Sequence, residues 1–249
     1  MSYAVVVLSG GLDSTVALWS ELLTATIDLR LGPTIEERCA RGVTAVTVDY
    51  GQRHRREISA ARAVVECWQA EAAHRMSEGR RAITLDHVIV EAPSLGHVLS
   101  GSALTDQTIA VPHGHYTAPT MVDTIVPNRN MIISSIAAGI AVARKAERLV
   151  LGVHAGDHPI YPDCRPEFVQ SLQHCIQVGT GTRLHVDAPF LTMTKDQIVR
   201  MGADMATPMN LTWSCYQGGN KHCGKCGTCV ERREAFSLAN VSDPTEYEE

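Results

Sequence analysis

The chain has 249 residues and a formal net charge of −5, and 45% of its residues are hydrophobic while 5% are aromatic. This length suits one large α/β domain, with or without a small appendage, and the aliphatic residues are numerous enough to fill a core. The negative charge argues against broad electrostatic capture of nucleic acid, although it allows a small basic patch.

The first predicted element is the short apolar run Ala4 to Leu8. A run of this length with β-branched residues predicts a strand that is buried on both faces. It is too short for a signal peptide and lacks a basic region before it. Glycines then allow a tight turn, and Asp13 suits the first turn of a helix that we expect to end near Leu23.

This strand, turn and helix start predict an anion site. Backbone N–H groups meet there, and the helix dipole adds partial positive charge. The stretch is not a Walker loop, because no Gly-Lys-Ser/Thr follows, and it lacks the third glycine of a dinucleotide fingerprint. It resembles the pyrophosphatase loop of the N-type ATP-cleaving superfamily, in which a substrate attacks the α-phosphate and leaves AMP and pyrophosphate. The alternative is an ordinary strand–turn–helix corner.

The next segments predict a second βα unit. Thr24–Arg41 has the polar, irregular composition of a surface insertion, and Val43–Val48 is β-branched almost throughout, which predicts a strand. Asp49 follows at the carboxyl end of this strand, where open α/β sheets bind ligands. A helix is expected from about His54 to Glu71. The apolar face of this helix consists of Ile58, Ala61, Val65 and Trp68.

Polar segments surround the third predicted strand, Ala82–Val90. The basic run Arg53–Arg56 fits a solvated helix end as well as a phosphate contact. Ala72–Arg81 has the composition of another insertion. Pro93–Val126 is a long stretch rich in proline and glycine, and a loop of this length in a compact domain suggests a lid or substrate loop.

Met131–Ala143 is apolar but too short to cross a bilayer, so it predicts a buried core helix. Arg129 stands just before it, where it can reach an anion from the helix start. Leu149–Val153 predicts a further strand. Alternating strands and helices indicate an α/β fold with a doubly wound, mostly parallel sheet.

The loop Asp157–Phe168 is dense in Asp, Tyr and Arg and lies between a strand end and a helix. A carboxylate can accept two parallel hydrogen bonds from an amidine-like edge, and an arginine can bind a carboxylate or a phosphate with two donors. Both a salt-bridged loop and a substrate site fit this composition. Cys164 within the loop is expected to be a small buried thiol rather than a nucleophile.

Half of the eight cysteines crowd into one short segment, as Cys215, Cys223, Cys226 and Cys229. Crowded cysteines without a secretory signal favour metal binding in a reducing cytoplasm over disulfides. Four thiolates suit a closed, structural tetrahedral zinc site, and an iron–sulfur cluster is the rival interpretation. Nearby lysines and arginines would also fit a zinc ribbon that binds nucleic acid.

Five motifs in order, over nearly the whole chain, resemble the 7-cyano-7-deazaguanine synthase family of the queuosine and archaeosine pathway. The motifs are Leu8-Ser9-Gly10-Gly11-x-Asp13-Ser14, Asp49-Tyr50-Gly51-Gln52-Arg53-His54, Val126-Pro127-x-Arg129-Asn130, Tyr161-Pro162-Asp163-Cys164-Arg165, and Ser214-Cys215-Tyr216 with the cysteine knuckle.

The resemblance implies an ATP-dependent C–N ligase with an adenine-nucleotide α-hydrolase-like fold. Such an enzyme converts 7-carboxy-7-deazaguanine and ammonia to 7-cyano-7-deazaguanine through an acyl-adenylate and an amide. We accordingly expect an ATP-pyrophosphatase-type domain over residues 1–205, a zinc-binding region over 206–240 and an acidic tail over 241–249. The family also implies a cytoplasmic homodimer that acts on small molecules, without a membrane and without stable nucleic-acid binding.

The resemblance further implies the site residues. Asp13 is expected to aid Mg²⁺, and Arg129, Asp163 and Arg165 to act in catalysis, with Asp163 and Arg165 recognising the purine and the carboxylate. The expected ATP-binding residues are Leu8, Ser9, Gly10, Gly11, Leu12, Asp13, Ser14, Thr15 and Asp49.

The chain departs from the family pattern at the two insertions and at His158-Pro159, which stands where small residues are common. The latter leaves open an enzyme that stops at 7-amido-7-deazaguanine or passes the activated base to another acceptor. A tRNA-thiolating enzyme would share the nucleotide loop, and a zinc-ribbon module would carry it as a vestige.

Overall fold

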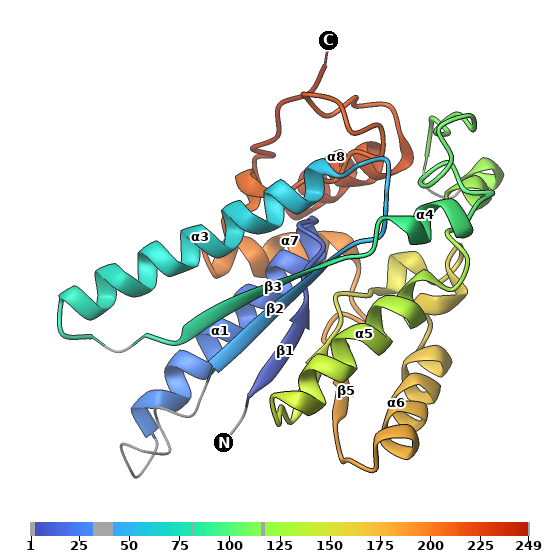
Figure 1. The fold of residues 1–249 in the computed structure, drawn as a ribbon. Coiled ribbons are helices and arrows are strands. Elements are labelled where there is room, and N and C mark those ends of the chain that lie inside the picture. The colour runs from blue at the N-terminus through green and yellow to red at the C-terminus, as the bar shows by residue number, and fades with distance from the viewer. Residues whose placement is uncertain (1–2, 32–41, 81, 116–117, 249) are drawn as a thin grey trace.

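The computed structural model describes residues 3–31, 42–80, 82–115 and 118–248. Its centre is a five-stranded, fully parallel sheet in the order β3-β2-β1-β4-β5 (Figure 1). The strands are β1 (Ala4–Val7), β2 (Gly42–Asp49), β3 (Thr84–Glu91), β4 (Arg148–Val150) and β5 (His185–Asp187). The predicted doubly wound parallel sheet is thereby confirmed.

Helices cover both faces of the sheet (Figure 1). One face packs on α1 (Leu12–Leu31), α3 (Arg56–Ser77), α7 (Lys195–Asp204) and α8 (Gly227–Ala239), and the other on α5 (Arg129–Ala143) and α6 (Pro166–Thr180). Successive residues of β1 point to opposite faces, so that Val6 joins the first core and Val5 the second. Both faces need apolar residues, which explains the unbroken valine run.

Two predicted boundaries are wrong. The first helix does not end near Leu23, because α1 continues to Leu31, and residues 32–41 of the expected insertion lie outside the described residues. Likewise α3 runs on to Ser77, so the segment from Ala72 is mostly helix, with Ala72 buried. Past the predicted ends, Ala25 of α1 and Ala72 of α3 still pack in the first core, so the apolar face of each helix extends at least one turn farther than the sequence pattern indicated.

The long stretch after β3 is largely packed against the rest of the chain. It contains α4 (Ser94–Val98) and the 3₁₀ turn η1 (Pro119–Thr124), and Ala103 and Val111 pack among the four crowded cysteines. The Arg53 guanidinium donates to the carbonyl oxygens of Asp106 and Ile109, at 3.0 and 3.1 Å. The segment therefore covers the cysteine region.

The apolar helix α5 is a half-buried element of the second core. Residues 119–143 are apolar enough, by length and composition alone, to cross a membrane. However, α5 has 15 residues and is about 22 Å long, which is shorter than the ~30 Å hydrocarbon core. Its residues Ala137, Ala138 and Ala141 are buried in the second core, while its four isoleucines, Ile132, Ile133, Ile136 and Ile140, are partly exposed.

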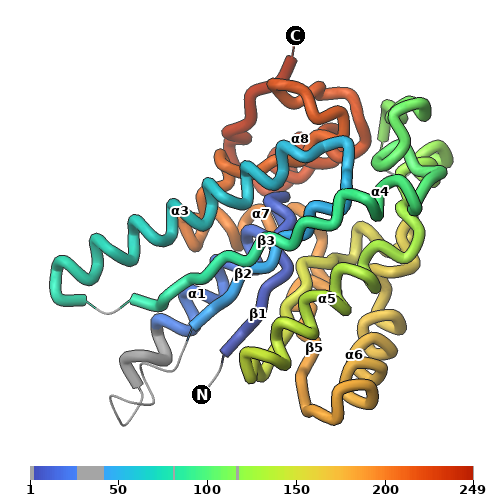
Figure 2. The backbone as a smooth tube through the Cα atoms, in the orientation of Figure 1, coloured from blue at the N-terminus to red at the C-terminus, as the bar shows by residue number. Residues whose placement is uncertain are grey.

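The strand order places a ligand crevice between β1 and β4. The chain leaves β1 toward β2 on one side, and β4 lies on the other, so the sheet order reverses here. Gly152, just after β4, lies so close to the start of α1 that a Cβ atom there would be 3.0 Å from the backbone of Ser14. Figure 2 shows the last part of the chain, orange to red, gathered above this end of the sheet with the start of α3.

Candidate active site

The turn between β1 and α1 is fixed by its own hydroxyls. Ser9 Oγ accepts a hydrogen bond from the Gly11 N–H at 3.1 Å and lies 3.0 Å from Ser14 Oγ. Thr15 Oγ1 donates to the Gly11 carbonyl at 2.8 Å. Gly10 has a φ of +89°, and a Cβ atom there would lie 2.1 Å from the Glu57 carbonyl oxygen of α3. The loop is therefore rigid, and only glycine fits at position 10.

A cavity of about 220 Å³ opens above this loop. Of the predicted nucleotide-binding residues, six line it: Leu8, Ser9, Gly11, Leu12, Asp13 and Ser14. Gly10 and Thr15 do not line the cavity but form part of the same turn. Arg129, the first residue of α5, also lines the cavity. The ends of β1 and β4 and the starts of α1, α3 and α5 thus converge on one hollow.

A buried ionic cluster forms one end of this cavity. The Lys195 ammonium lies 3.1 Å from Asp13 Oδ2 and 2.8 Å from Glu231 Oε2, and all three side chains are less than one-fifth exposed. Burial opposes ionisation of Asp13, but Lys195 and His154 outweigh it and lower the pKa of this carboxyl. Burial likewise opposes the charge on Lys195, yet the two carboxylates raise its pKa. Asp13 and Lys195 are therefore ionised at neutral pH, whereas at Glu231 burial outweighs the effect of Lys195 and raises the pKa of the carboxyl.

His154 completes this cluster from the loop after β4. Its Nδ1 accepts the Gly156 N–H at 3.1 Å, so the neutral ring carries its proton on Nε2. Nε2 lies 3.5 Å from Asp157 Oδ2 and 3.9 Å from Asp13 Oδ2. Asp13 Oδ1 is buried and has no hydrogen-bond partner among the described residues. This free oxygen is the kind of ligand that Mg²⁺ takes.

The other end of the cavity is aromatic and carries a partly buried cation. Tyr50, Tyr161 and Tyr216 line it together with Arg129. Burial raises the pKa of Tyr50 to about 12, against the opposing effect of the Arg129 guanidinium. Burial works against the charge of Arg129, but the tyrosines and Asp163 raise its pKa well above the usual value. A charged guanidinium in an aromatic wall suits a planar anion.

Three predicted site residues do not line the cavity and instead hold its walls. Asp49 is buried, pairs with the Arg55 guanidinium at 2.5 Å and accepts the Gly51 N–H at 3.1 Å. Asp163 Oδ2 accepts the Asn130 N–H at 3.1 Å, in the first turn of α5. Arg165 is exposed, and its Nε donates to the His158 carbonyl at 2.8 Å.

The basic run before α3 is in part a solvated helix end, since Arg55 and Arg56 are exposed, and its guanidinium groups also bind neighbouring residues. Arg53 anchors the long loop, and Arg55 pairs with Asp49. The Arg56 guanidinium lies 4.7 Å from the Trp213 ring centroid and donates to the Gly219 carbonyl at 3.3 Å. The run therefore joins the start of α3 to its neighbours.

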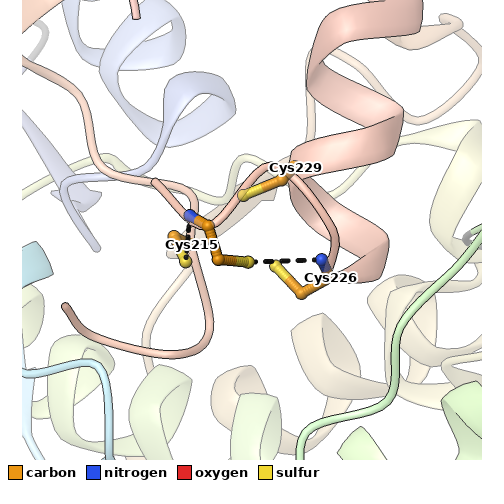
Figure 3. Close-up of side chains that lie close together, drawn as sticks. Cys215, Cys226 and Cys229 are labelled. Atoms are coloured by element: carbon orange, nitrogen blue, oxygen red, sulfur yellow. Dashed lines mark hydrogen bonds between the residues drawn. The ribbon is translucent and has the colours of Figure 1, made fainter. Parts of the chain in front are cut away.

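The four crowded cysteines form one buried cluster. Their sulfur atoms all lie within 4.8 Å of one another, and the Cys215, Cys226 and Cys229 sulfurs turn toward each other (Figure 3). Sulfur atoms around one tetrahedral zinc ion, each at about 2.3 Å, are about 3.8 Å apart. The residues therefore fit a metal site of four thiolates. Hydrogen bonds from Cys215 and Cys229 hold the pKa of Cys226 far below its usual range.

The cysteine cluster is tied directly to the phosphate loop. The Trp213 N–H donates to the Gly10 carbonyl at 2.9 Å, two residues before Cys215. Arg232 is fully buried, donates to Ser214 Oγ at 3.1 Å, and contacts Asp243 at 3.4 Å in the segment after α8. Residues 241–248 thus pack on the cysteine region, which holds one wall of the cavity.

Sequence reasoning missed Lys195 and Glu231 and gave no role to His154. One signal was available for Lys195, which occupies the first turn of α7, where the helix dipole disfavours a cation. Such a placement indicates that the side chain meets negative charge elsewhere. Glu231 lies within α8 and carries no local signal.

Comparisons with known proteins agree over nearly the whole chain. The family model described as queuosine biosynthesis protein QueC matches residues 3–240. A 7-cyano-7-deazaguanine synthase of Allorhizobium ampelinum is 45% identical over 248 residues, which cover 98% of this chain and 92% of that protein. The 7-cyano-7-deazaguanine synthase 1 of Mesorhizobium japonicum is 44% identical over 250 residues, covering 99% and 94%.

Among solved structures, the U34-tRNA thiolase NcsA of Methanococcus maripaludis, with its 4Fe-4S cluster, covers 100% of this chain and 77% of its own. The TM-score is 0.43 and the identity 12%. This likeness is too low to bear on the metal or the activity of the present chain.

The Lys195 cluster generates a stability prediction. Lys195→Met leaves two buried carboxylates without their cation, so we expect a loss of about 3–5 kcal/mol in the free energy of unfolding at pH 7. The pKa of Asp13 is lowered in the folded state, so its stabilising contribution is present above its unfolded pKa and is lost as the pH falls through its folded pKa. The difference between variant and wild type should therefore shrink as the pH falls below about 4.

Urea unfolding across this pH range measures the effect. Lys221→Met is the matched control, because Lys221 forms an exposed pair with Glu246 at 3.5 Å. An exposed pair contributes about 0–1 kcal/mol. Equal losses in the two variants, or a Lys195→Met loss that does not change with pH, would contradict the role of the cluster.

Proposed function

The chain belongs to the QueC family, and we propose that it is a 7-cyano-7-deazaguanine synthase that uses ATP and ammonia to convert 7-carboxy-7-deazaguanine to the nitrile. One observation carries this proposal. A single cavity joins a phosphate loop with a largely buried ionic cluster to an aromatic wall with a partly buried arginine. A nucleotide and a planar carboxylate therefore have complementary surfaces at the two ends of one site.

The substrate carboxylate must first be activated, because ammonia cannot displace oxide from it. We place the β- and γ-phosphates on the backbone N–H groups of the loop from Ser9 to Ser14, at the N-terminus of α1. Lys195 faces the same end and stabilises the negative charge that develops on the leaving pyrophosphate. Mg²⁺ would be held by Asp13 Oδ1 together with phosphate oxygens and would supply charge neutralisation there.

Arg129 is suited to orient the reacting substituent. Its guanidinium can bind the substrate carboxylate so that one oxygen attacks the α-phosphate, which yields an acyl-adenylate and pyrophosphate. Tyr50 and Tyr216 supply apolar ring surface against the deazapurine. Asp163 and Arg165 would support recognition indirectly, since Asp163 holds the first turn of α5. Asp49 likewise would support the nucleotide site through Arg55.

The same site can serve the second activation. Ammonia displaces AMP to give the amide, whose oxygen stands where the carboxylate oxygen stood. A second ATP then activates that oxygen, and elimination of AMP leaves the nitrile. His158 and Pro159 do not line the cavity, which supports the nitrile as the endpoint. Burial raises the pKa of the Cys164 thiol far above its usual value, which disfavours a thiolation chemistry based on it.

The cysteine cluster is proposed to hold one structural zinc ion. The compact spacing of the four sulfur atoms suits a single tetrahedral ion better than an iron–sulfur cluster, whose thiolates bind separate irons and so stand farther apart. Four protein ligands leave no open position for substrate, so the ion would hold the wall that contains Trp213 and Ser214 in place. Its contribution is to folding.

The cellular setting of the enzyme is also part of this proposal. The described cysteines form no disulfide, which suits a reducing cytoplasm. The partly exposed isoleucines of α5, Ile132, Ile136 and Ile140, suit a contact with a second copy of the chain in a homodimer. The cavity is of a size for small molecules rather than for a nucleic acid strand.

Asp13→Asn tests the activation step. The substitution keeps the size of the side chain, and Lys195 retains Glu231 at 2.8 Å, so the fold should persist. Loss of the carboxylate at the proposed metal position should lower carboxylate-dependent AMP formation by about 100-fold or more. AMP is measured by chromatography, and thermal unfolding checks the fold. A folded variant with AMP formation near the wild-type rate would show that the loop does not act in this way.

The metal proposal predicts one zinc per chain in the purified protein. Cys226→Ser should lose zinc and lower the thermal unfolding temperature, because the binding energy of a closed thiolate site adds directly to folding stability. Metal analysis and thermal unfolding measure both effects. Cys175→Ser is the control, since Cys175 is exposed and lies outside the cluster. Iron with visible absorbance in anaerobically purified protein would contradict the zinc assignment.

A further inference from the structure

His54 and Glu57 are two titratable residues of the cavity wall. Neither has a role in the proposed binding of the phosphates or of the substrate carboxylate. Both line the cavity from the start of α3. His54 is 4% exposed, and its Nε2 lies 3.3 Å from Glu57 Oε2. His54 and Glu57 lie side by side, largely buried, and face a site where a nitrogen nucleophile must lose protons. Such a pair points to proton transfer.

Glu57 is held in one orientation. Its Oε1 accepts a hydrogen bond from Gln52 Nε2 at 2.9 Å, and Gln52 Oε1 in turn accepts the Tyr50 N–H at 2.9 Å. The Glu57 backbone carbonyl also abuts Gly10 of the phosphate loop. The carboxylate is thus fixed beside the reaction site and presents Oε2 to His54.

This arrangement selects the tautomer of His54. A carboxylate accepts hydrogen bonds, so the ring nitrogen beside it, Nε2, carries the proton and Nδ1 keeps its lone pair. Nδ1 is buried and has no hydrogen-bond partner among the described residues. The other titratable or charged groups around the ring are Tyr216, 5.4 Å away between ring centroids, and Tyr50 and Arg129 in the same cavity.

We propose that His54 and Glu57 form the site that receives ammonium and that His54 Nδ1 is the base that deprotonates it. The inference rests on the proposed function, since it concerns the nitrogen nucleophile of that reaction. Ammonium is the main form at neutral pH and has no lone pair with which to attack. The fixed negative charge of Glu57 attracts the cation, and it also stabilises the imidazolium that forms.

The proton balance closes for both halves of the reaction. In the first half an N–H bond of ammonium breaks, the proton goes to His54 Nδ1, and the freed electron pair attacks the acyl carbon. AMP leaves with the electrons of the carbon–oxygen bond, and the added nitrogen gives up one further proton. In the second half the amide nitrogen loses its two protons, one on activation of the oxygen and one on elimination of AMP. His54 passes each proton to solvent before it takes the next.

Hydroxylamine separates this role from a merely structural one, because it is neutral at neutral pH and attacks without prior deprotonation. In His54→Gln, carboxylate-dependent exchange of pyrophosphate into ATP should stay within about 2-fold of wild type. Amide and nitrile formation from ammonium should fall by about 100-fold or more. Hydroxamate formation from hydroxylamine should stay near the wild-type rate.

His74→Gln is the matched control, because His74 and Glu78 form an exposed pair at 3.5 Å near the end of α3. Thermal unfolding checks the fold of each variant. If His54→Gln does not fold, Glu57→Gln must show the same selective loss with ammonium, at a smaller size. Equal losses with ammonium and hydroxylamine, or no loss with either, would overturn the assignment. A wild-type protein that forms no carboxylate-dependent AMP would instead reject the proposed function.

Discussion

The close approach of three backbone segments at Gly10 is the constraint on which the rest of the structure depends. The start of α3 lies so near that only a glycine fits, and the Trp213 N–H donates to the Gly10 carbonyl at 2.9 Å. The phosphate loop is therefore held between the sheet domain and the cysteine region. A metal would hold the cysteine region in place. Any motion of that region would reach the loop through the hydrogen bond from Trp213 to Gly10. This connection explains why a closed metal site with no open ligand position can still matter to catalysis.

The cavity that this constraint forms has two chemically distinct ends. At one end a largely buried lysine stands between two carboxyl groups and holds the pKa of Asp13 below its usual value. At the other end Arg129 lies among tyrosines, and burial raises the pKa of one of them, Tyr50, to about 12. In the proposed reaction a nucleotide would bring its negative charge to the first end and a planar acid would bring its charge to the second. The reacting carboxylate and the α-phosphate would then meet between the two ends.

The elements that sequence alone predicted are those with a strong local signal. A few consecutive residues are enough to recognise the valine run of β1, the β-branched residues of β2, the glycine turn and the four cysteines. All are present where expected. Helix ends were less predictable, because the polar segments after Leu23 and Glu71 begin with residues that remain helical, and Ala25 and Ala72 still pack in the core. The cluster of Lys195, Glu231 and His154 could not be found in this way, since α7, α8 and the loop after β4 bring it together only in the folded chain.

The motif residues also divide into two kinds that the sequence does not distinguish. Ser9, Asp13 and Arg129 face the cavity. Asp49 and Asp163 do not, and they accept hydrogen bonds from neighbouring backbone N–H groups and so hold the cavity wall in place. A family motif marks both kinds equally, and only geometry separates them.

The central claim is that one site performs two activations on the same substituent carbon, and its most direct test uses the amide as the starting substrate. Wild-type protein is incubated with 7-amido-7-deazaguanine and ATP, without the carboxylate, and the products are followed by mass spectrometry and AMP analysis. The account predicts conversion to the nitrile with one ATP cleaved to AMP for each molecule, and twice that amount from the carboxylate. If the carboxylate is converted to an amide that accumulates and is never consumed with fresh ATP, the account is contradicted.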